Sequence, residues 1–511
     1  MTHQLLFVLK LGFHCHHHRC SLSLSLSLSS ADYTDNAGRT FVFAITENVA
    51  ERHDVTVIVS STSSSQDAAH VEFFFKSLNI ANATVPAGGS RHVTLPRRVV
   101  LHHDAIGTHY QDGILMTSDQ DVTLQVFSDA HHRSMDGFLA LPTHALGKEY
   151  FIMAYTPWIQ SQFVIVGVEE GTYVRFFSKT PYRYGGVTVK PGVPLTLLLD
   201  RLQAKQMACI ECDFTGSAIF SNKPVAVISG NRCAFVPHDN DVRSCDTMVE
   251  QLPPVNQWGS TYAIVPLIGR NPTITNQYRV LAARYGTEVS VGAHRVSLAR
   301  GHYHEFGLRN NESTLVIANE PVLLAQFISG YDADNSTANS TGRGDPTMTI
   351  VPDFTQGVTD ATVATYDVTK EGTPMVNYLT VVAECHDFAN IRYDDEPVAD
   401  NITPQSVDDI SDVCFVSRRM ENGTHHVSSL LNLTKFAAVQ YGFADYNAYA
   451  HPAALSVRTT LCFTYASTGE RLEHHCDQEV FVVELPYGGT YPPPAAEPCD
   501  YSECFNPSEY F

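Results

Sequence analysis

The chain consists largely of short stretches in which hydrophobic and polar residues alternate. Examples are DVTVIVSS (54–61), RHVTLP (91–96), GTYVRFF (171–177) and PLTLLLD (194–200), each bounded by Gly, Pro, Asn or Asp. A period of two predicts strands with one buried face, and the bounding residues predict tight turns. No stretch predicts a helix of three turns. We therefore expect an all-β protein.

One strand pattern recurs four times, about 100 residues apart, in DVTLQVFSD (121–129), KPVAVISGN (223–231), EPVLLAQFISG (320–330) and KFAAVQYGF (435–443). An Asp follows each of the first three copies, and an apolar-Pro pair follows that Asp six or seven positions later. The three motifs are Asp136 with Leu141-Pro142, Asp246 with Leu252-Pro253, and Asp345 with Val351-Pro352. A shared register of this kind indicates repeated structural units.

Roughly seven strands in about 100 residues fit an antiparallel β-sandwich. We expect tandem antiparallel β-sandwich-like modules in about four repeats, spanning residues 38–160, 161–275, 276–370 and 371–460. A β-propeller-like arrangement is the alternative, and blades of about 40 to 50 residues would require two blades per repeat.

Both ends of the chain depart from this pattern. LLFVLKLGF is short for a signal peptide and is broken by Lys10, while HCHHHRC offers His and Cys ligands and precedes an alternating SLSLSLSLSS run. A TCTCTC nucleotide repeat encodes Ser-Leu, so we expect residues 1–31 to be an aberrant signal or low-complexity segment, with the mature chain starting near Ala31 or Asp32. Residues 461–511 predict a Cys/Pro-rich segment, either a truncated linker or a tail that cross-links chains.

Composition and charge limit the classes of partner that the chain can bind. The chain has 511 residues, of which 44% are hydrophobic and 17% charged, which is ample for packed cores. A formal net charge of -21 argues against nucleic acid, and the absence of a run of 18 apolar residues predicts no transmembrane segment. The 24 His would gain positive charge as pH falls below 7. Two hypotheses explain their number: they are scattered surface residues, or their protonation controls a pH-sensitive self-assembly.

Sequons and cysteines favour a secreted, extracellular protein. Ten of the twelve cysteines lie outside the first thirty residues, an even number that fits a disulfide framework. The candidate glycosylation sites are Asn82, Asn311, Asn335, Asn339, Asn401, Asn422 and Asn432.

Sequence proximity suggests the disulfide partners. Cys233 and Cys245 flank an eleven-residue loop and are expected to pair. Cys209 and Cys212 have redox-motif spacing and could join that pair in a four-thiolate zinc site, but a structural disulfide is favoured because no helix follows to activate a thiolate. The remaining candidates are Cys385 with Cys414, Cys462 with Cys476, and the C-terminal Cys499 and Cys504.

Signals of catalysis and of metal binding are weak. The chain has neither a Gly-x-Ser-x-Gly elbow nor a His-Glu-x-x-His motif. We interpret His131-His132 beside Asp129, and the GHYHEF cluster (301–306), as strand and turn residues. The DADNST segment (332–337) begins like a calcium loop but lacks the required Gly and Glu. We expect no catalytic residue, no cofactor and no metal.

The triplet Arg343-Gly344-Asp345 is a candidate cell-adhesion motif just after two sequons. Asp345 also occupies the register of Asp136 and Asp246, which gives it a structural reason to be there. An integrin-type adhesion ligand is therefore the alternative function.

The chain resembles the N-terminal domain of the IgGFc-binding protein family over about residues 38–460. The motifs that carry the resemblance are DGFLALPTHALGKEYF (136–151), DFTGSAIFSNKPVAVISGNRC (213–233), CDTMVEQLPPVNQWG (245–259), GDPTMTIVP (344–352) and YGFADYNAYAHP (441–452). It implies a secreted, non-catalytic glycoprotein of mucus or extracellular matrix that binds extracellular proteins or glycans. A glycan-active enzyme is the least favoured hypothesis.

Overall fold

A computed structural model provides the structure. It describes the backbone of residues 6–16, 19–34, 457–465 and 471–475, and residues 36–50, 53–62, 65–102, 109–130, 133–210, 212–238, 244–334, 344–367, 374–430 and 434–456, apart from the side chains of Asp332 and Asp334. The chain divides into two compact units, one comprising Asp35–Val457 and the other comprising Met1–Thr34 with Arg458–Phe511. The smaller unit contains an antiparallel sheet of β1 (Leu6–His16), β2 (Arg19–Thr34), β36 (Val457–Tyr465) and β37 (Arg471–His475).

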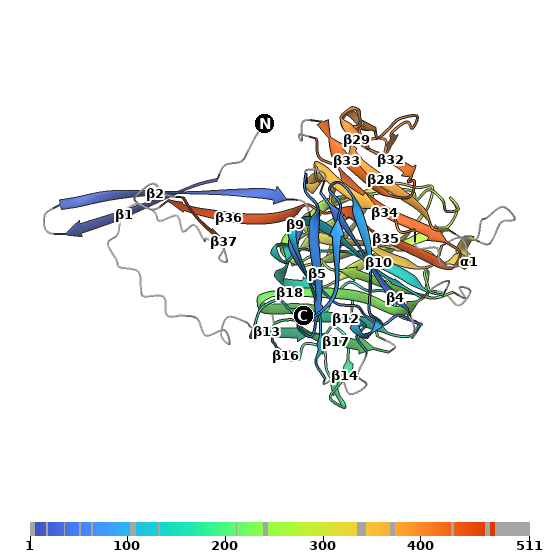
Figure 1. The fold of residues 1–511 in the computed structure, drawn as a ribbon, viewed down its shortest axis with the longest axis horizontal. Helices are drawn as coiled ribbons and strands as arrows, with labels where there is room; N and C mark the ends of the chain where they lie inside the picture. The colour runs from blue at the N-terminus through green and yellow to red at the C-terminus, as the bar shows by residue number, and fades with distance from the viewer. Residues whose placement is uncertain are drawn as a thin grey trace. The chain divides into compact units, whose positions relative to one another are not determined.

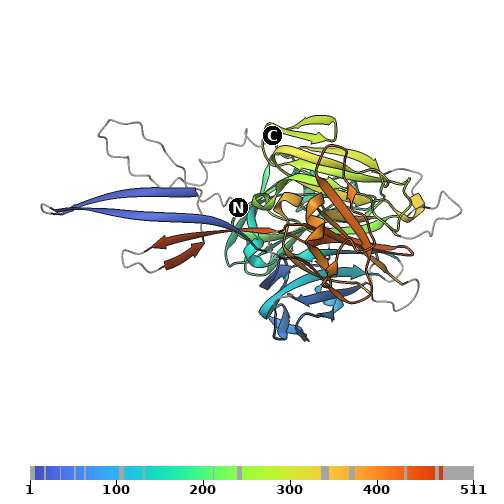
Figure 2. The ribbon, with the colours of Figure 1, turned by 90° about the horizontal axis from the view of Figure 1, so that it is seen from above.

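The larger unit confirms the all-β prediction, because its strands form several antiparallel sheets (Figures 1 and 2). The α-helix among the described residues, α1 (Tyr331–Asp334), is a single turn. No helix in the described part of the chain is long and apolar enough to cross a membrane.

The first group of strands, module 1, is organised by one long strand, β9 (Ile114–Asp129). The first half of β9 pairs with β3 and β5, and its second half pairs with β4 and β10. The polar residues Ser118 to Asp121 lie between the two halves, where β9 passes from one set of partners to the other. The other elements are β3 (Gly38–Phe43), β4 (Asp54–Ser61), β5 (Ala69–Phe75), β6 (Leu78–Val85), β7 (Ser90–Leu95), η1 (Arg97–Val99) and β10 (Met135–Ala140).

Module 2 repeats this plan around β18 (Ala218–Ala234), whose halves pair with β11 and β13 and then with β12 and β19. The polar Ser221-Asn222-Lys223 separates the halves. The other strands are β8 (Gln111–Asp112), β11 (Gly147–Phe151), β12 (Ser161–Gly167), β13 (Thr172–Phe177), β14 (Tyr182–Tyr184), β15 (Val187–Val189), β16 (Pro194–Leu199), β17 (Gln203–Cys209) and β19 (Asp246–Gln251).

Module 3 is built around β25 (Thr314–Ile328), which pairs first with β20 and β22 and then with β21 and β26. Its other strands are β20 (Gly259–Ile264), β21 (Thr275–Ala282), β22 (Thr287–Val291), β23 (His294–Leu298), β24 (Tyr303–Arg309) and β26 (Thr347–Ile350).

In module 4, two strands take the place of the one long strand that organises each of the other modules. β33 (Thr424–Ser429) pairs with β27 and β29, whereas β34 (Ala437–Ala444) pairs with β28 and β35. The other elements are β27 (Asp360–Ala364), β28 (Val376–Glu384), η5 (Cys385–Ala389), β29 (Ile391–Tyr393), β30 (Glu396–Pro397), β31 (Gln405–Ser406), β32 (Val413–Arg419) and β35 (Asn447–Ala454).

Four fully buried strands connect the modules in a closed cycle. β10 contacts β19, β19 contacts β26, β26 contacts β35, and β35 contacts β10. In Figure 1 this closure is visible where β35, in orange, lies beside β10. The buried apolar side chains of the modules fill the space between their sheets.

The chain passes from each module to the next through a short turn that leads into a strand of the following sheet. After β10, β19 and β26 the chain turns through η2 (Thr143–Ala145), η3 (Val255–Gln257) and η4 (Phe354–Gln356). It then adds β11, β20 and β27 to the sheets of the following module. These strands precede the expected boundaries at residues 161, 276 and 371, and the boundaries themselves stay predictions.

Candidate functional site

The aspartates that share a register meet between the four central strands. Among the described strands, β10, β19 and β26 each pair with one neighbour, so the backbone N–H groups along their other edges need partners. Asp136 supplies two such partners, because its Oδ2 accepts hydrogen bonds from Val249 N at 2.9 Å and Met348 N at 3.3 Å. Its Oδ1 accepts from Thr347 Oγ1 and Gly137 N. One carboxylate thus joins three modules.

Two more carboxylates work in the same way. Asp246 Oδ2 accepts from Met135 N at 3.2 Å, and Glu250 Oε1 accepts from Ile350 N at 3.2 Å. Burial raises the pKa of Asp136, Asp246 and Glu250 well above the usual range, and Asp345 adds to the shift at Asp246 by charge repulsion. We call Asp136, Asp246, Glu250 and Asp345 the central carboxylates.

The triplet suggested as an adhesion motif ends in one of these central carboxylates. Asp345 is 2% exposed, and Gly344, with φ +101°, donates its N–H to Ala444 O at 2.7 Å. A receptor that reads Arg-Gly-Asp has to reach the carboxylate, so this burial argues against the adhesion hypothesis. Arg343 lies outside the described residues.

An apolar cleft lies where the central strands end. Its cavity volume is about 40 Å³, and four of the residues that line it, Leu141, Pro253, Val351 and Pro352, belong to the repeated apolar-Pro motif. Leu455 follows β35 and lines the same cleft. The buried Asp353 accepts four hydrogen bonds, from Ser260 N, Thr261 N, Thr355 N and Thr355 Oγ1, which fix the wall. Such a cleft can accept a small apolar group of a partner, and we call it the axial cleft.

A chain of buried polar side chains closes the cycle between modules 1 and 4. His451 Nδ1 donates to Pro452 O at 2.9 Å, so Nε2 carries the lone pair and accepts from Gln125 Nε2 at 3.0 Å. The same Gln125 amide bonds Gln440 Oε1, and Gln440 Nε2 donates to Tyr449 Oη. Burial lowers the pKa of His451 to about 4. Gln125 lies far from the others in the sequence, and no local pattern marks them as neighbours.

A buried arginine links modules 2 and 3. Arg279 is 1% exposed and pairs with Asp213 at 2.6 Å and Glu305 at 2.7 Å. Its guanidinium lies over the rings of Tyr155 and Tyr303. Glu305 of the GHYHEF segment is therefore engaged in an ion pair, in agreement with the structural interpretation of that cluster.

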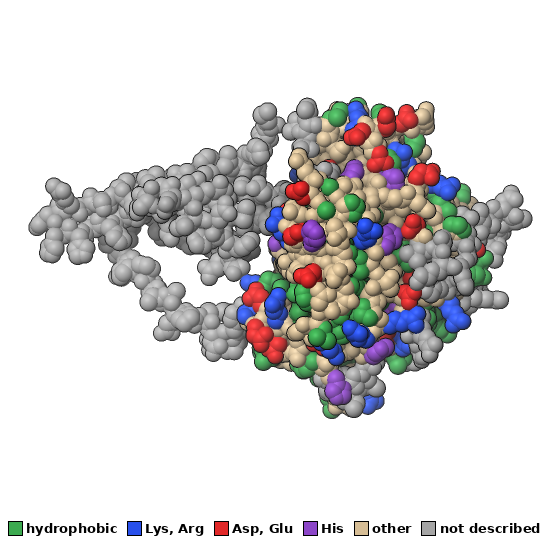
Figure 3. Space-filling view, viewed as in Figure 1, with side chains coloured by type: hydrophobic (Ala, Val, Ile, Leu, Met, Phe, Trp, Pro, Cys, Tyr) green, Lys and Arg blue, Asp and Glu red, His purple; other side chains and the backbone are tan. Residues whose placement is uncertain are grey.

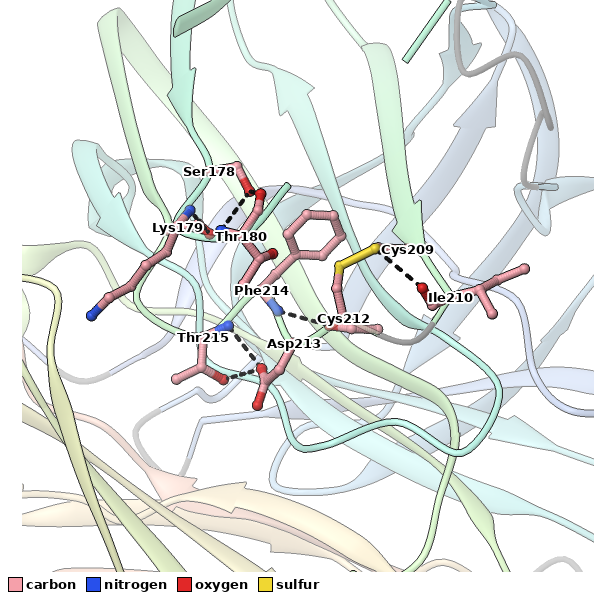
Figure 4. The surroundings of a disulfide bond; sticks show 11 residues. Ser178, Lys179, Thr180, Cys209, Ile210, Cys212, Asp213, Phe214 and Thr215 are labelled. Carbon is pink, nitrogen blue, oxygen red and sulfur yellow. Dashed lines mark hydrogen bonds between the residues drawn. A yellow bond between two sulfur atoms is a disulfide. The ribbon is translucent and has the colours of Figure 1, made fainter. Parts of the chain in front are cut away.

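Cys209 and Cys212 form a disulfide at the end of β17, as Figure 4 shows. Asp213 follows directly and accepts hydrogen bonds from Thr215 N and Oγ1, which orients it toward Arg279. Cys233 bonds Cys245, and Cys385 bonds Cys414. Because both Cys209–Cys212 and Cys233–Cys245 are disulfides, their thiolates are not available for a four-thiolate zinc site. The side chains of Cys462, Cys476, Cys499 and Cys504 lie outside the described residues.

The described sequons are all exposed. Asn82, Asn311, Asn401 and Asn422 lie at the surface, whereas Asn335, Asn339 and Asn432 lie outside the described residues. His131 and His132 also lie outside them. In the described part of the chain, Glu384, His386 and Asp412 bring ligand atoms within 4.8 Å of one another, but an exposed cluster of this kind does not by itself make a metal site.

Together, the modules and the hydrogen-bonded carboxylates define an all-β scaffold of the kind that binding proteins use. Residues 136–442 match the family model described as IgGFc binding protein. The chain belongs to the IgGFc-binding protein family. It is 25% identical to the human (Homo sapiens) IgGFc-binding protein over 342 residues, which is 64% of this chain and 6% of the human protein.

Proposed function

We propose that the chain is a secreted, glycosylated and disulfide-stabilised protein of mucus or extracellular matrix that binds extracellular proteins without catalysis. Family membership across the central strands carries this proposal. The four exposed sequons and three disulfides support it, since both features are typical of extracellular proteins.

The axial cleft is the contact site that the geometry favours. Its wall is apolar at Leu141, Trp258 and Leu455, and the amide side chains of Gln257 and Gln356 also line it. An apolar centre with polar groups beside it is the usual composition of a protein contact site. On the face that Figure 3 shows, acidic and basic side chains are interspersed, so this face has no large patch of a single charge.

A pull-down with the full chain from native secretion, followed by mass spectrometry, tests the proposal. The name of the human relative specifies the Fc region of IgG, so purified Fc is the first defined probe for biolayer interferometry. We expect Leu455→Arg, at the cleft, to weaken capture of the partner. Ile410→Arg is the matched control, because Ile410 is 97% exposed and does not line the cleft. Equal capture by both variants would exclude the cleft as the contact site.

Assembly of the chain with itself is a separate proposal that follows from the unassigned cysteines and the His content. Non-reducing electrophoresis reports disulfide-linked species, and light scattering between pH 7 and 5.5 reports pH-dependent association. A monomer under all of these conditions would contradict self-assembly and leave the binding proposal intact.

A further inference from the structure

A polar cavity lies between modules 1 and 2, apart from the axial cleft. Its cavity volume is about 340 Å³, at the lower end of the range of ligand sites, and module 1 contributes Glu47, His53 and His102. Arg232, about 180 residues further along the chain, completes it from module 2. We call it the intermodule cavity.

His53 lines this cavity and carries a buried hydrogen-bond acceptor. The residue is 3% exposed, and its Nδ1 donates to Ala50 O at 3.1 Å, which leaves the lone pair on Nε2. Among the described residues, none forms a hydrogen bond with that nitrogen. Burial is the main cause that lowers the pKa of His53, with Arg97 and His102 adding to it, so the ring stays neutral and Nε2 remains an acceptor near pH 7. A buried acceptor without a protein partner is costly, and a ligand hydroxyl would satisfy it.

Charged groups of both signs face the same space. Glu47, with a side chain 13% exposed, has Oε2 3.6 Å from Arg232 Nη1 and Oε1 3.6 Å from His102 Nδ1. Gln160 Nε2 donates to Glu47 Oε2 at 3.1 Å, and Arg232 Nε donates to Asn48 O at 3.3 Å, so the acid and the base are both held in place. The cavity therefore combines fixed acceptors with a fixed donor.

This combination selects among ligand classes. An anion would meet Glu47, and a cation would meet Arg232. A metal ion is disfavoured, because the His53, His102 and Glu47 ligand atoms are not among the described groups that come within 4.8 Å of one another. A sugar hydroxyl both donates and accepts, so it can bond His53 or Glu47 while accepting from Arg232. The lining residues Ala50 and Val100 offer apolar contact to the C–H face of a ring.

We propose that the intermodule cavity binds a neutral saccharide unit through His53, Glu47 and Arg232. An exposed aromatic ring stands on the adjoining segment: Trp158 is 61% exposed, and its backbone N–H donates to the carbonyl of Cys233, the residue after Arg232. Such a ring gives a longer glycan a surface on which to stack. The assignment adds a ligand to the proposed binding function, and protein capture at the axial cleft does not depend on it.

Saturation-transfer NMR on the full chain tests the saccharide site, with the methyl glycosides of mannose, galactose and N-acetylglucosamine as probes. We expect at least one glycoside to bind the wild-type chain. Glu47→Gln and His53→Phe should each weaken binding roughly tenfold, because each removes a hydrogen-bond acceptor from a buried site. His294→Phe, the same replacement at an exposed residue of β23, is the control and should bind normally.

Three results would overturn the assignment: no transfer from any glycoside, transfer that survives both cavity variants, or His53-dependent binding of zinc chloride without binding of a glycoside. Far-UV circular dichroism verifies the fold of each variant. If His53→Phe unfolds, Glu47→Gln decides the question alone. Protein pull-down with the same variants separates the two proposals, because a failed saccharide site predicts unchanged protein capture.

Discussion

The buried His451 should make the closure between modules 1 and 4 sensitive to acid. Its Nε2 accepts a hydrogen bond from Gln125, so a proton on that nitrogen would face the amide N–H donors of Gln125. His451 also packs against the rings of Phe127 and Tyr449, and Gln440 bonds Gln125. None of these groups carries a negative charge that could stabilise a protonated His451. Protonation of the folded chain is therefore unfavourable.

The magnitude follows from the pKa change. Burial lowers the pKa of His451 from 6.5 to about 4, so between these values the unfolded chain binds a proton that the folded chain does not. Stability from this residue is complete above pH 6.5 and is lost as pH falls toward 4. At pH 5, about 1.5 units below the ordinary pKa, the loss amounts to about 2 kcal/mol.

Asp136, Asp246 and Glu250 act in the opposite direction. Burial raises the pKa of Asp136, Asp246 and Glu250, so their contribution is complete at low pH and is lost as pH rises through the folded-state pKa values. A comparison of the wild-type chain with His451→Gln cancels this common part. What remains is the pH dependence of His451 alone.

Urea unfolding at pH 7 and pH 5, followed by tryptophan fluorescence, measures the effect. Between the two conditions the wild-type chain should lose about 2 kcal/mol more than His451→Gln. His294→Gln, at an exposed position, is the control and should behave like the wild-type chain. If the wild type and His451→Gln lose equal stability, His451 titrates normally and the deduction from its burial is refuted.

Three further substitutions test other parts of the structure. Arg279→Met should destabilise the chain by about 3 to 5 kcal/mol because it leaves Asp213 without its buried partner, whereas the exposed Arg295→Met should change the thermal midpoint little. Asp136→Asn should destabilise, because both carboxyl oxygens accept hydrogen bonds and an amide NH₂ would oppose two donors; urea unfolding measures this loss. Arg343→Ala should leave cell attachment to chain-coated plates unchanged, since Asp345 is buried, and a loss of attachment would restore the adhesion hypothesis.

Local patterns predicted the strands well because each pattern reports one physical property. Alternation in DVTVIVSS predicted a strand, and that segment is β4, although both faces of β4 are buried and not one. The register of Asp136, Asp246 and Asp345 pointed to equivalent positions, and all three are buried. The sequence could not show that the long strands β9, β18 and β25 each serve two sets of partners, because alternation specifies faces and not neighbours.

The sequence by itself determined the all-β class, the recurrence of its strands and the family, because these depend on spacing along the chain. Only the tertiary structure decided which groups face one another. It buried the Asp345 carboxylate of a triplet that reads as an adhesion motif, and it brought Glu47 within 3.6 Å of Arg232. Burial and the distance between remote residues determine what a side chain can bind, and both arise from the packing of modules that no local pattern encodes.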